Sequence, residues 1–231
     1  MTEIKHDIDD NQPIQIRATA KRNGLSSLIF GLLLLMIAIL MFKVLPENVT
    51  LVAIFVTSAG IVALLLGLLK LREPQHSLTI SKTQIDYQHR NGRWSLSWEN
   101  VQRIDIPKVS SGLEQRSLSL VGLRVKHYGP ILESISPRLM THLLMEQRPL
   151  LLQNNADCAS GSCYGDDLLE DDIYKDSDGK IYKGVQGMFA NRMAKLRERL
   201  GYDLFINSAE LDRSVEEFAD LLRACHRSLL S

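Results

Sequence analysis

The side chains best suited to chemistry lie in one stretch, DCASGSCYGDDLLEDD, at residues 157–172. It holds two thiols, Cys158 and Cys163, and then a dense run of carboxylates. Thiols and carboxylates in this order could form a metal site, a redox pair, or a magnesium-dependent diphosphate site like that of prenyl synthases. The same composition is also typical of an exposed, solvated loop.

The ligand count favours the loop. A tetrahedral zinc site needs four ligands, usually cysteine or histidine. This segment offers two thiols, and none of the six histidines has a matching spacing. The neighbouring carboxylates also disfavour the thiolate form, which argues against an activated nucleophile. We therefore expect free thiols and no metal or other cofactor, with a thiol or metal site at Cys158 and Cys163 as the alternative.

Two further motifs are weaker. DSDGK, at residues 176–180, shares the Asp-x-Asp-Gly core of an EF-hand loop, but Tyr174 and Val185 occupy the first and twelfth ligand positions. GVQG, at residues 184–187, resembles a nucleic-acid-binding GxxG loop, although four residues are too few to indicate that function. The chain has no nucleotide-binding or hydrolase motif. We expect neither an enzyme nor a nucleic-acid-binding protein, and the sequence identifies no small-molecule substrate.

Two long apolar segments precede this region. They are LSSLIFGLLLLMIAILMF at residues 25–42 and VTLVAIFVTSAGIVALLLGLL at residues 49–69. Each is close to the roughly 20 residues that a helix needs to cross a bilayer. Both are apolar on every face, whereas a core helix of a soluble protein keeps a polar stripe. A short connector joins them, so we predict a transmembrane helical hairpin over residues 25–71, preceded by a tail at residues 1–24.

Basic side chains flank the outer ends of this hairpin. Arg17, Lys21 and Arg22 precede the first segment, and Lys70 and Arg72 follow the second. The connector has a single lysine, offset by a glutamate. The positive-inside rule therefore predicts a multi-pass membrane protein with both termini in the cytoplasm.

Small side chains mark one face of the second segment. Ala59, Ala63 and Gly67 recur every fourth residue, a spacing that lets another helix approach closely. We expect this face to pack within the hairpin, and a second copy of the chain is the alternative partner.

Residues 72–231 are predicted to form a cytoplasmic domain with strands first and helices later. SLTISKTQIDYQ indicates two strands, and Asn91-Gly92 is a strong hairpin signal. Trp94 and Trp98 alternate with serines, so we expect both rings to face the core. The segment SLSLVGLRVKHY indicates another strand.

Three helices are predicted in the second half of the domain. The first, SPRLMTHLLMEQR, is closed by Pro149, and the second, VQGMFANRMAKLRERLG, ends at its glycine. The last begins at a capping box of Ser214 and Glu217 and places Cys225 in the core. A strand, YDLFI, lies between the second and third helices.

The second of these helices carries a basic strip, formed by Arg192, Lys195 and Arg199. A strip of this kind can face anionic lipid at a membrane surface. It is also typical of an ordinary solvated face, and the sequence leaves both interpretations open.

The segments SWENVQRIDI, YDLFI and RSVEEFADLLRAC, placed after two spans, resemble bacterial membrane proteins that carry a pleckstrin-homology-like domain. In that fold a bent antiparallel sheet is closed by a C-terminal helix. More closely, LRVKHYGPILESISPRLMTHLLMEQRPLLLQ and YGDDLLEDDIYKDSDGKIYKGVQGMFANRMAKLRERLGYDLFI resemble an uncharacterised gammaproteobacterial domain-of-unknown-function family of two-span membrane proteins. The resemblance implies an α+β membrane protein whose antiparallel β domain has a helical insertion at about residues 128–199, and it implies no activity.

These features together predict a non-catalytic integral inner-membrane protein. Its cytoplasmic domain is expected to bind a protein partner or to assemble with itself. The two alternatives are a module that binds anionic lipid at the membrane surface and a thiol or metal site in the acidic loop.

Overall fold

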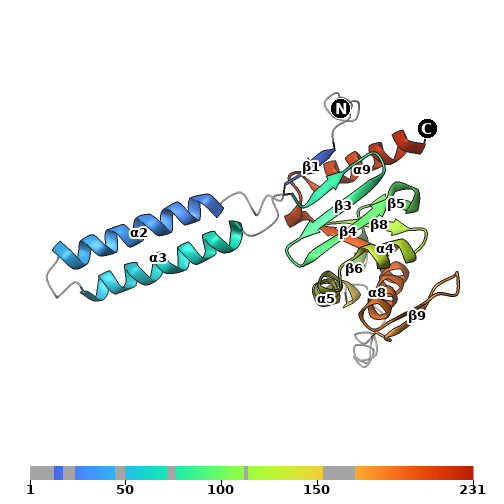
Figure 1. Ribbon diagram of the computed structural model, residues 1–231. Helices are drawn as coiled ribbons and strands as arrows, with labels where there is room; N and C mark the ends of the chain where they lie inside the picture. The colour runs from blue at the N-terminus through green and yellow to red at the C-terminus, as the bar shows by residue number, and fades with distance from the viewer. Residues whose placement is uncertain are drawn as a thin grey trace. The chain divides into compact units, whose positions relative to one another are not determined.

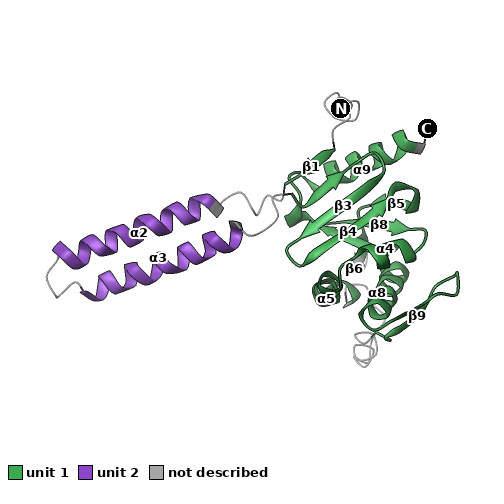
Figure 2. Cartoon of the chain, in the orientation of Figure 1, with its two compact units in different colours: residues 1–17, 76–231 green, residues 18–75 purple. Residues whose placement is uncertain are grey.

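The computed structural model describes residues 13–17, 24–44, 50–71, 76–111, 114–152 and 170–230. The chain forms two compact units, shown in different colours in Figure 2. Unit 1 comprises residues 1–17 and 76–231, and unit 2 comprises residues 18–75. Unit 1 contains both strands and helices, whereas unit 2 is a pair of helices (Figure 1).

Unit 2 consists of α2 (Gly24–Val44) and α3 (Thr50–Leu71), which lie side by side (Figure 1). Leu25–Val44 and Thr50–Lys70 are each long and apolar enough to cross a membrane. Most of their large apolar side chains are exposed. The structure confirms the predicted pair of apolar helices. Both helices form because neither segment contains a residue that breaks the helix before its predicted end.

Small residues line the contact between α2 and α3, and the buried ones are Gly31, Ala38, Ala53, Gly60 and Gly67. A Cβ added to Gly31 would lie 2.7 Å from the backbone nitrogen of Leu64, so the two backbones are in close contact. Gly67 lies in this contact as predicted, but Ala59 is exposed. The buried positions repeat every seven residues, which is the spacing of a packed helix pair.

The first sheet of unit 1 has four antiparallel strands: β1 (Ile14–Ile16), β2 (Leu78–Ile80), β3 (Gln84–His89) and β4 (Gly92–Ser97). Strand β1 precedes unit 2 in the chain and β2 follows it, yet Ile14 pairs with Ile80 and Ile16 with Leu78. The assignment of residues 1–24 to a tail is therefore wrong for β1. Ile16 is fully buried in the core, but its partner strand comes after unit 2 in the sequence, so no local pattern marks the pairing.

The hairpin between β3 and β4 depends on a glycine. Its loop residues are Arg90 and Asn91, one position earlier than predicted, and Gly92 begins β4 with a φ of +143°. A Cβ at Gly92 would lie 1.6 Å from the Ser136 side-chain oxygen. Backbone conformation and close packing therefore both require glycine at this position.

The second sheet of unit 1 has the order β11-β8-β5, formed by β5 (Val101–Asp105), β8 (Leu120–Val125) and β11 (Leu204–Asn207). The C-terminal helix, α9 (Val215–Leu230), contacts β5 and β8. The Ser214 hydroxyl accepts a hydrogen bond from the Glu217 backbone N–H at 3.2 Å, as half of the predicted capping box. A separate hairpin of β6 (Lys108–Ser111) and β7 (Glu114–Ser117) was not predicted.

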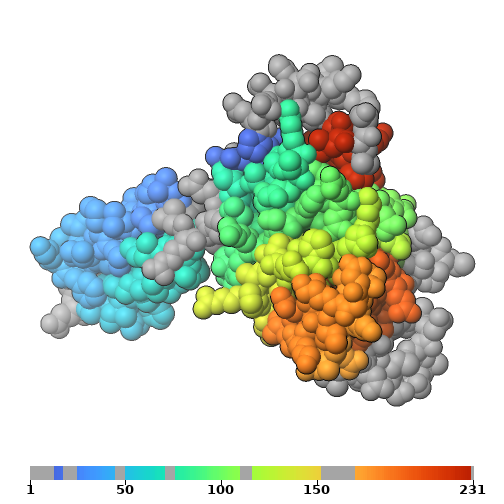
Figure 3. Space-filling model, turned by 45° about the vertical axis from the view of Figure 1, so that its right-hand side comes forward, coloured from blue at the N-terminus to red at the C-terminus, as the bar shows by residue number. Residues whose placement is uncertain are grey.

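The predicted insertion lies between β8 and β11, which pair directly with each other. It contains α4 (Gly129–Ser134), α5 (Pro137–Glu146), α6 (Arg148–Leu152), β9 (Ile173–Lys175), β10 (Ile181–Lys183) and α8 (Val185–Leu200). Met140 and Phe189 are fully buried in the same core as Trp94 and Trp98, so the core prediction for both tryptophans is confirmed. Figure 3 shows the yellow and orange insertion against the green strands. The insertion is thus part of the domain core.

Two local predictions within the insertion need correction. Pro149 lies in the first turn of α6, where proline is well tolerated, and does not close α5, which ends at Glu146. DSDGK forms the turn of an unpredicted β9–β10 hairpin, in which the Asp176 N–H donates to the Lys180 carbonyl at 2.9 Å. The motif therefore has a structural explanation in the turn, where Gly179 has a φ of +82°.

Candidate functional site

The residues predicted to do chemistry are only partly described. Cys158, Cys163 and most of the acidic run lie outside the described residues. Free thiols and the absence of zinc there stay predictions. Within the part of the chain that the structure describes, no three histidine, cysteine or acidic side chains gather closely enough to hold a metal ion. Cys225 is buried as predicted, and burial raises the pKa of its thiol.

The basic strip on α8 is not one exposed face. Arg192 is fully buried, and its guanidinium donates to the Glu170 carboxylate at 2.5 Å and to the Leu144 carbonyl at 2.9 Å. Lys195 and Arg199 are half-buried, and Arg199 donates to the Leu151 carbonyl. Arg192 therefore cannot face lipid. The prediction that Arg192 lies in an exposed basic strip is wrong, because α5 and α6 pack against α8.

A second buried ion pair joins α8 to the second sheet. The Asp203 carboxylate accepts hydrogen bonds from the Val125 N–H at 2.8 Å, the Tyr128 hydroxyl at 2.7 Å and the Arg197 guanidinium at 2.6 Å. Burial and the Asp203 charge both raise the pKa of Tyr128. Each polar group here has a protein partner, so we assign this cluster to folding rather than to ligand binding.

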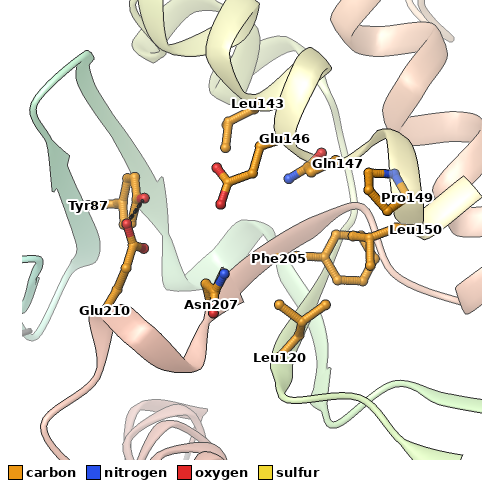
Figure 4. A pocket seen from close by; sticks show the side chains of 10 residues that line it. All are labelled: Tyr87, Leu120, Leu143, Glu146, Gln147, Pro149, Leu150, Phe205, Asn207 and Glu210. Atoms are coloured by element: carbon orange, nitrogen blue, oxygen red, sulfur yellow. Dashed lines mark hydrogen bonds between the residues drawn. The ribbon is translucent and has the colours of Figure 1, made fainter. Parts of the chain in front are cut away.

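A cavity of about 110 Å³ is the candidate binding site (Figure 4). It lies among β3, the end of α5, β11 and the short turn Ser208–Glu210. The described residues that line it are Tyr87, Leu120, Leu143, Glu146, Gln147, Pro149, Leu150, Phe205, Asn207 and Glu210. Figure 4 shows a polar side with Tyr87 and Glu210 and an apolar side with Leu120 and Phe205.

The polar side of the cavity carries two carboxylates. The Tyr87 hydroxyl donates to the Glu210 carboxylate at 2.6 Å, and Glu146 faces the cavity from α5 (Figure 4). Burial raises the pKa of Tyr87, and the charges of Glu210 and Glu146 raise it further. His142 contacts the Glu146 carboxylate at 3.3 Å but does not line the cavity. None of the ten described lining residues is basic.

Gln147 is the buried polar side chain of this cavity. The residue is 5% exposed, and its backbone N–H and carbonyl are both hydrogen-bonded within the α5–α6 region. Its side-chain amide points into the cavity (Figure 4). An amide in this position can both donate and accept a hydrogen bond, so it can orient a polar ligand.

Asn207 adds a second amide to the same cavity. Its side-chain oxygen accepts from the Ala209 N–H at 3.2 Å, while its nitrogen is directed toward the cavity (Figure 4). Two carboxylates and two amides therefore converge on one small volume. Such groups bind and orient a polar ligand, and they include no nucleophile activated by a base.

The sequence analysis missed this site. Tyr87, Glu146, Asn207 and Glu210 come from four separate elements, and none belongs to a recognisable motif. The one local signal is the adjacency of Glu146 and Gln147 at the end of α5. Such a polar helix end is common on protein surfaces and indicates a site only once β3 and β11 are placed beside it.

Residues 78–228 match the family model described as "Protein of unknown function (DUF2982)". The chain belongs to the DUF2982 family. The match runs from β2 into α9 and includes every described residue of the cavity, so the DUF2982 region coincides with most of unit 1. The predicted membership of a domain-of-unknown-function family is confirmed. No curated protein and no solved structure matches the chain.

Proposed function

We propose that this DUF2982 protein is a non-catalytic integral membrane protein of the bacterial inner membrane. Unit 2 crosses the bilayer as a two-helix hairpin, and unit 1 is a cytoplasmic module that binds a protein partner or assembles with itself. The observation that carries this proposal is the pairing of β1 with β2 across the hairpin.

This pairing constrains the topology. The chain leaves the first sheet after Ile16, passes through α2 and α3, and re-enters the same sheet at Leu78. Both ends of the hairpin must therefore be on the side of the membrane that holds unit 1. Two spans satisfy this condition, whereas a single span would separate β1 from β2. The basic residues beside both outer ends support the cytoplasmic side.

The arrangement of unit 1 supports a pleckstrin-homology-like fold. Two antiparallel sheets are followed by a C-terminal helix, α9, that contacts β5 and β8. Figure 1 shows this helix alongside the strands of unit 1. The insertion between β8 and β11 is the main addition to such a fold, and its four helices, α4, α5, α6 and α8, all contain buried apolar residues.

The insertion also supports a role in binding. Exposed large apolar side chains of the described part of unit 1 lie mainly there, at Met145, Ile173, Ile181 and Val185. Ile173 and Ile181 lie on the paired strands β9 and β10 and are each 55% exposed. Exposed apolar side chains grouped on one element are typical of a protein contact. Lipid binding by the α8 strip is not proposed, because Arg192 is buried.

Reporter fusions test the topology. Alkaline phosphatase, which is active only outside the cytoplasm, should be active when fused in the connector at residues 45–49 and inactive at the C-terminus. Green fluorescent protein at the C-terminus should be fluorescent. As a control, deletion of residues 50–71 should make the C-terminal phosphatase active, because one span then remains. Phosphatase activity at the C-terminus of the intact chain would refute the hairpin.

Site-specific photocrosslinking tests the binding role. A photoreactive phenylalanine analogue at Ile181 in native membranes should give a defined adduct, because this exposed side chain lies on the proposed contact element. The same analogue at exposed Glu216 of α9 serves as the control and should give none. An adduct of twice the chain mass indicates self-assembly, and another mass indicates a partner. Equal or no adducts at both positions would contradict the assignment of the contact to the insertion.

A further inference from the structure

We infer that the outer edge of β10 binds an extended strand of a partner protein whose side chains alternate between apolar and acidic. This inference rests on the proposed role of the insertion in protein binding. It adds the mode of binding and the chemistry of the partner, and its failure would leave the membrane topology unaffected.

The hydrogen-bond pattern of the β9–β10 hairpin shows which backbone groups face outward. The Asp176 N–H donates to the Lys180 carbonyl at 2.9 Å, so these two residues form a hydrogen-bonded pair. Hydrogen-bonded and non-hydrogen-bonded pairs alternate along an antiparallel ladder. In the register of this hairpin, Ile181 and Lys183 of β10 therefore belong to non-hydrogen-bonded pairs, and their N–H and C=O groups point away from β9.

The two edges of the hairpin differ. The Asn191 side chain of α8 donates to the carbonyls of Asp171 at 2.8 Å and Ile173 at 3.0 Å, so α8 covers the outer edge of β9. On β10, the outward backbone groups of Ile181 and Lys183 form no hydrogen bond with any other residue that the structure describes. The hairpin lies beside α8 in Figure 1. An unpaired strand edge is a template for a further strand, so β10 can accept one.

The exposed face of the hairpin combines apolar and basic side chains. Its members are all exposed, and they are Ile173, Lys175, Ile181 and Lys183. The register places each isoleucine opposite a lysine. Tyr182 points to the opposite face and is 4% exposed, so that face packs against the domain. The apolar and basic face is therefore the one that a strand added beside β10 would extend.

The lysines of this face select the charge of the partner. Lys180, in the turn, pairs with Glu133, whereas Lys175 and Lys183 form no ion pair with another described residue. Asp176 lies on the opposite face, and the other acidic residues near the hairpin lie before β9 or in its turn. The two lysines on the strands are therefore available to carboxylates of a partner.

Cross-strand pairing defines the sequence of the partner strand. Apolar pairs and pairs of opposite charge stabilise adjacent strands, whereas like charges directly opposite destabilise them. The favoured strand places an apolar side chain opposite Ile181 and a carboxylate opposite Lys183. A second copy of the hairpin is less suited, because joining two β10 edges would gather the lysines of both copies on one face without a carboxylate.

Peptide binding to the full chain in detergent tests this inference. The probe is the capped, fluorescently labelled peptide TVTETVTET, whose valines and glutamates share one face of an extended strand. Fluorescence anisotropy should show saturable binding of one peptide per chain. The peptide TVTKTVTKT should bind at least about tenfold more weakly, because it places lysine opposite Lys183. Equal binding of both peptides, or no saturable binding, would overturn the inference.

Two substitutions at one position test the backbone pairing. Ile181→Ala keeps the outward N–H, whereas Ile181→Pro removes it without removing a hydrogen bond to β9. Both variants should remain folded in a thermal melt. Ile181→Pro should bind TVTETVTET about fivefold or more weakly than Ile181→Ala, because a backbone donor is lost. Equal affinities of these variants would rule out strand addition.

A charge exchange tests the partner chemistry independently of proline. Lys183→Glu should weaken binding of TVTETVTET and strengthen binding of TVTKTVTKT, each by about fivefold or more. Lys82→Glu, which reverses an exposed charge in the turn between β2 and β3, should leave both affinities unchanged. The same response in both variants would mean that the peptides respond to overall charge, and the site on β10 would be refuted.

Photocrosslinking at Ile181 in native membranes separates this inference from the proposed function. A defined adduct there, together with no binding of TVTETVTET, would refute the acidic strand and leave the protein contact of the insertion in place. An adduct of twice the chain mass would identify a second copy as the occupant and would also overturn the inference. An adduct of another mass that TVTETVTET suppresses, and TVTKTVTKT does not, is the expected result.

Discussion

Replacing Arg192 by methionine is expected to lower the free energy of unfolding of unit 1 by about 3–5 kcal/mol. Methionine retains most of the buried apolar stem, so the change chiefly removes the charge. The Glu170 carboxylate, whose side chain is 4% exposed, would lose its 2.5 Å partner, and the Leu144 carbonyl would lose a donor. A buried charge without a partner is among the most destabilising defects a fold can contain.

Urea unfolding of the full chain in detergent measures this effect. Trp94 and Trp98 are the two tryptophans of the chain, and both are buried in unit 1, so their fluorescence reports its unfolding. Arg103→Ala is the matched control, because that side chain is 62% exposed beside Asp105 and its loss should change stability by less than about 1 kcal/mol.

A second variant separates charge from packing at the same place. The double substitution Arg192→Met with Glu170→Leu removes both charges and should be more stable than Arg192→Met alone, because an apolar pair needs no counterion. An unchanged midpoint of urea unfolding for the Arg192→Met variant would show that Arg192 is exposed in solution. The basic strip on α8 would then again be a candidate surface for binding.

Replacing Asp203 by alanine is expected to destabilise unit 1 by about 3 kcal/mol. Asp203 is fully buried and accepts from a backbone N–H, from the Tyr128 hydroxyl and from Arg197, so three donors lose their acceptor. The Arg197 side chain is 28% exposed, and partial hydration of its charge keeps the loss near the lower end of the range for buried pairs. The same tryptophan signal measures the change.

Graded variants check the origin of this effect. Tyr128→Phe removes one hydrogen bond to Asp203 and should cost about 1 kcal/mol. Asp220→Ala, in an exposed pair with Arg223 on α9, should cost less than about 1 kcal/mol. Equal losses for Asp203→Ala and Asp220→Ala would mean that the Asp203 network adds nothing beyond a surface ion pair.

Local patterns in the sequence determined the elements whose stability depends on near neighbours. The apolar lengths of α2 and α3, the β3–β4 hairpin, the end of α8 at Gly201 and the cap of α9 at Ser214 were all predictable. Each depends on residues within a few positions of one another, because helix ends and tight turns satisfy their own backbone groups. The strand YDLFI and the burial of the two tryptophans were predicted from the sequence pattern of apolar and polar side chains, which is also local.

Only the tertiary structure decided the features that depend on distant partners. Strand β1 is a strand because β2, which follows unit 2 in the sequence, provides its hydrogen bonds. Arg192 is buried because α5 and α6 cover α8, although its place on a basic helical strip is typical of an exposed side chain. The cavity exists because β3, α5 and β11 bring Tyr87, Gln147 and Asn207 together. Burial and ligand geometry are properties of long-range packing, and a one-dimensional pattern does not contain the partners that create them.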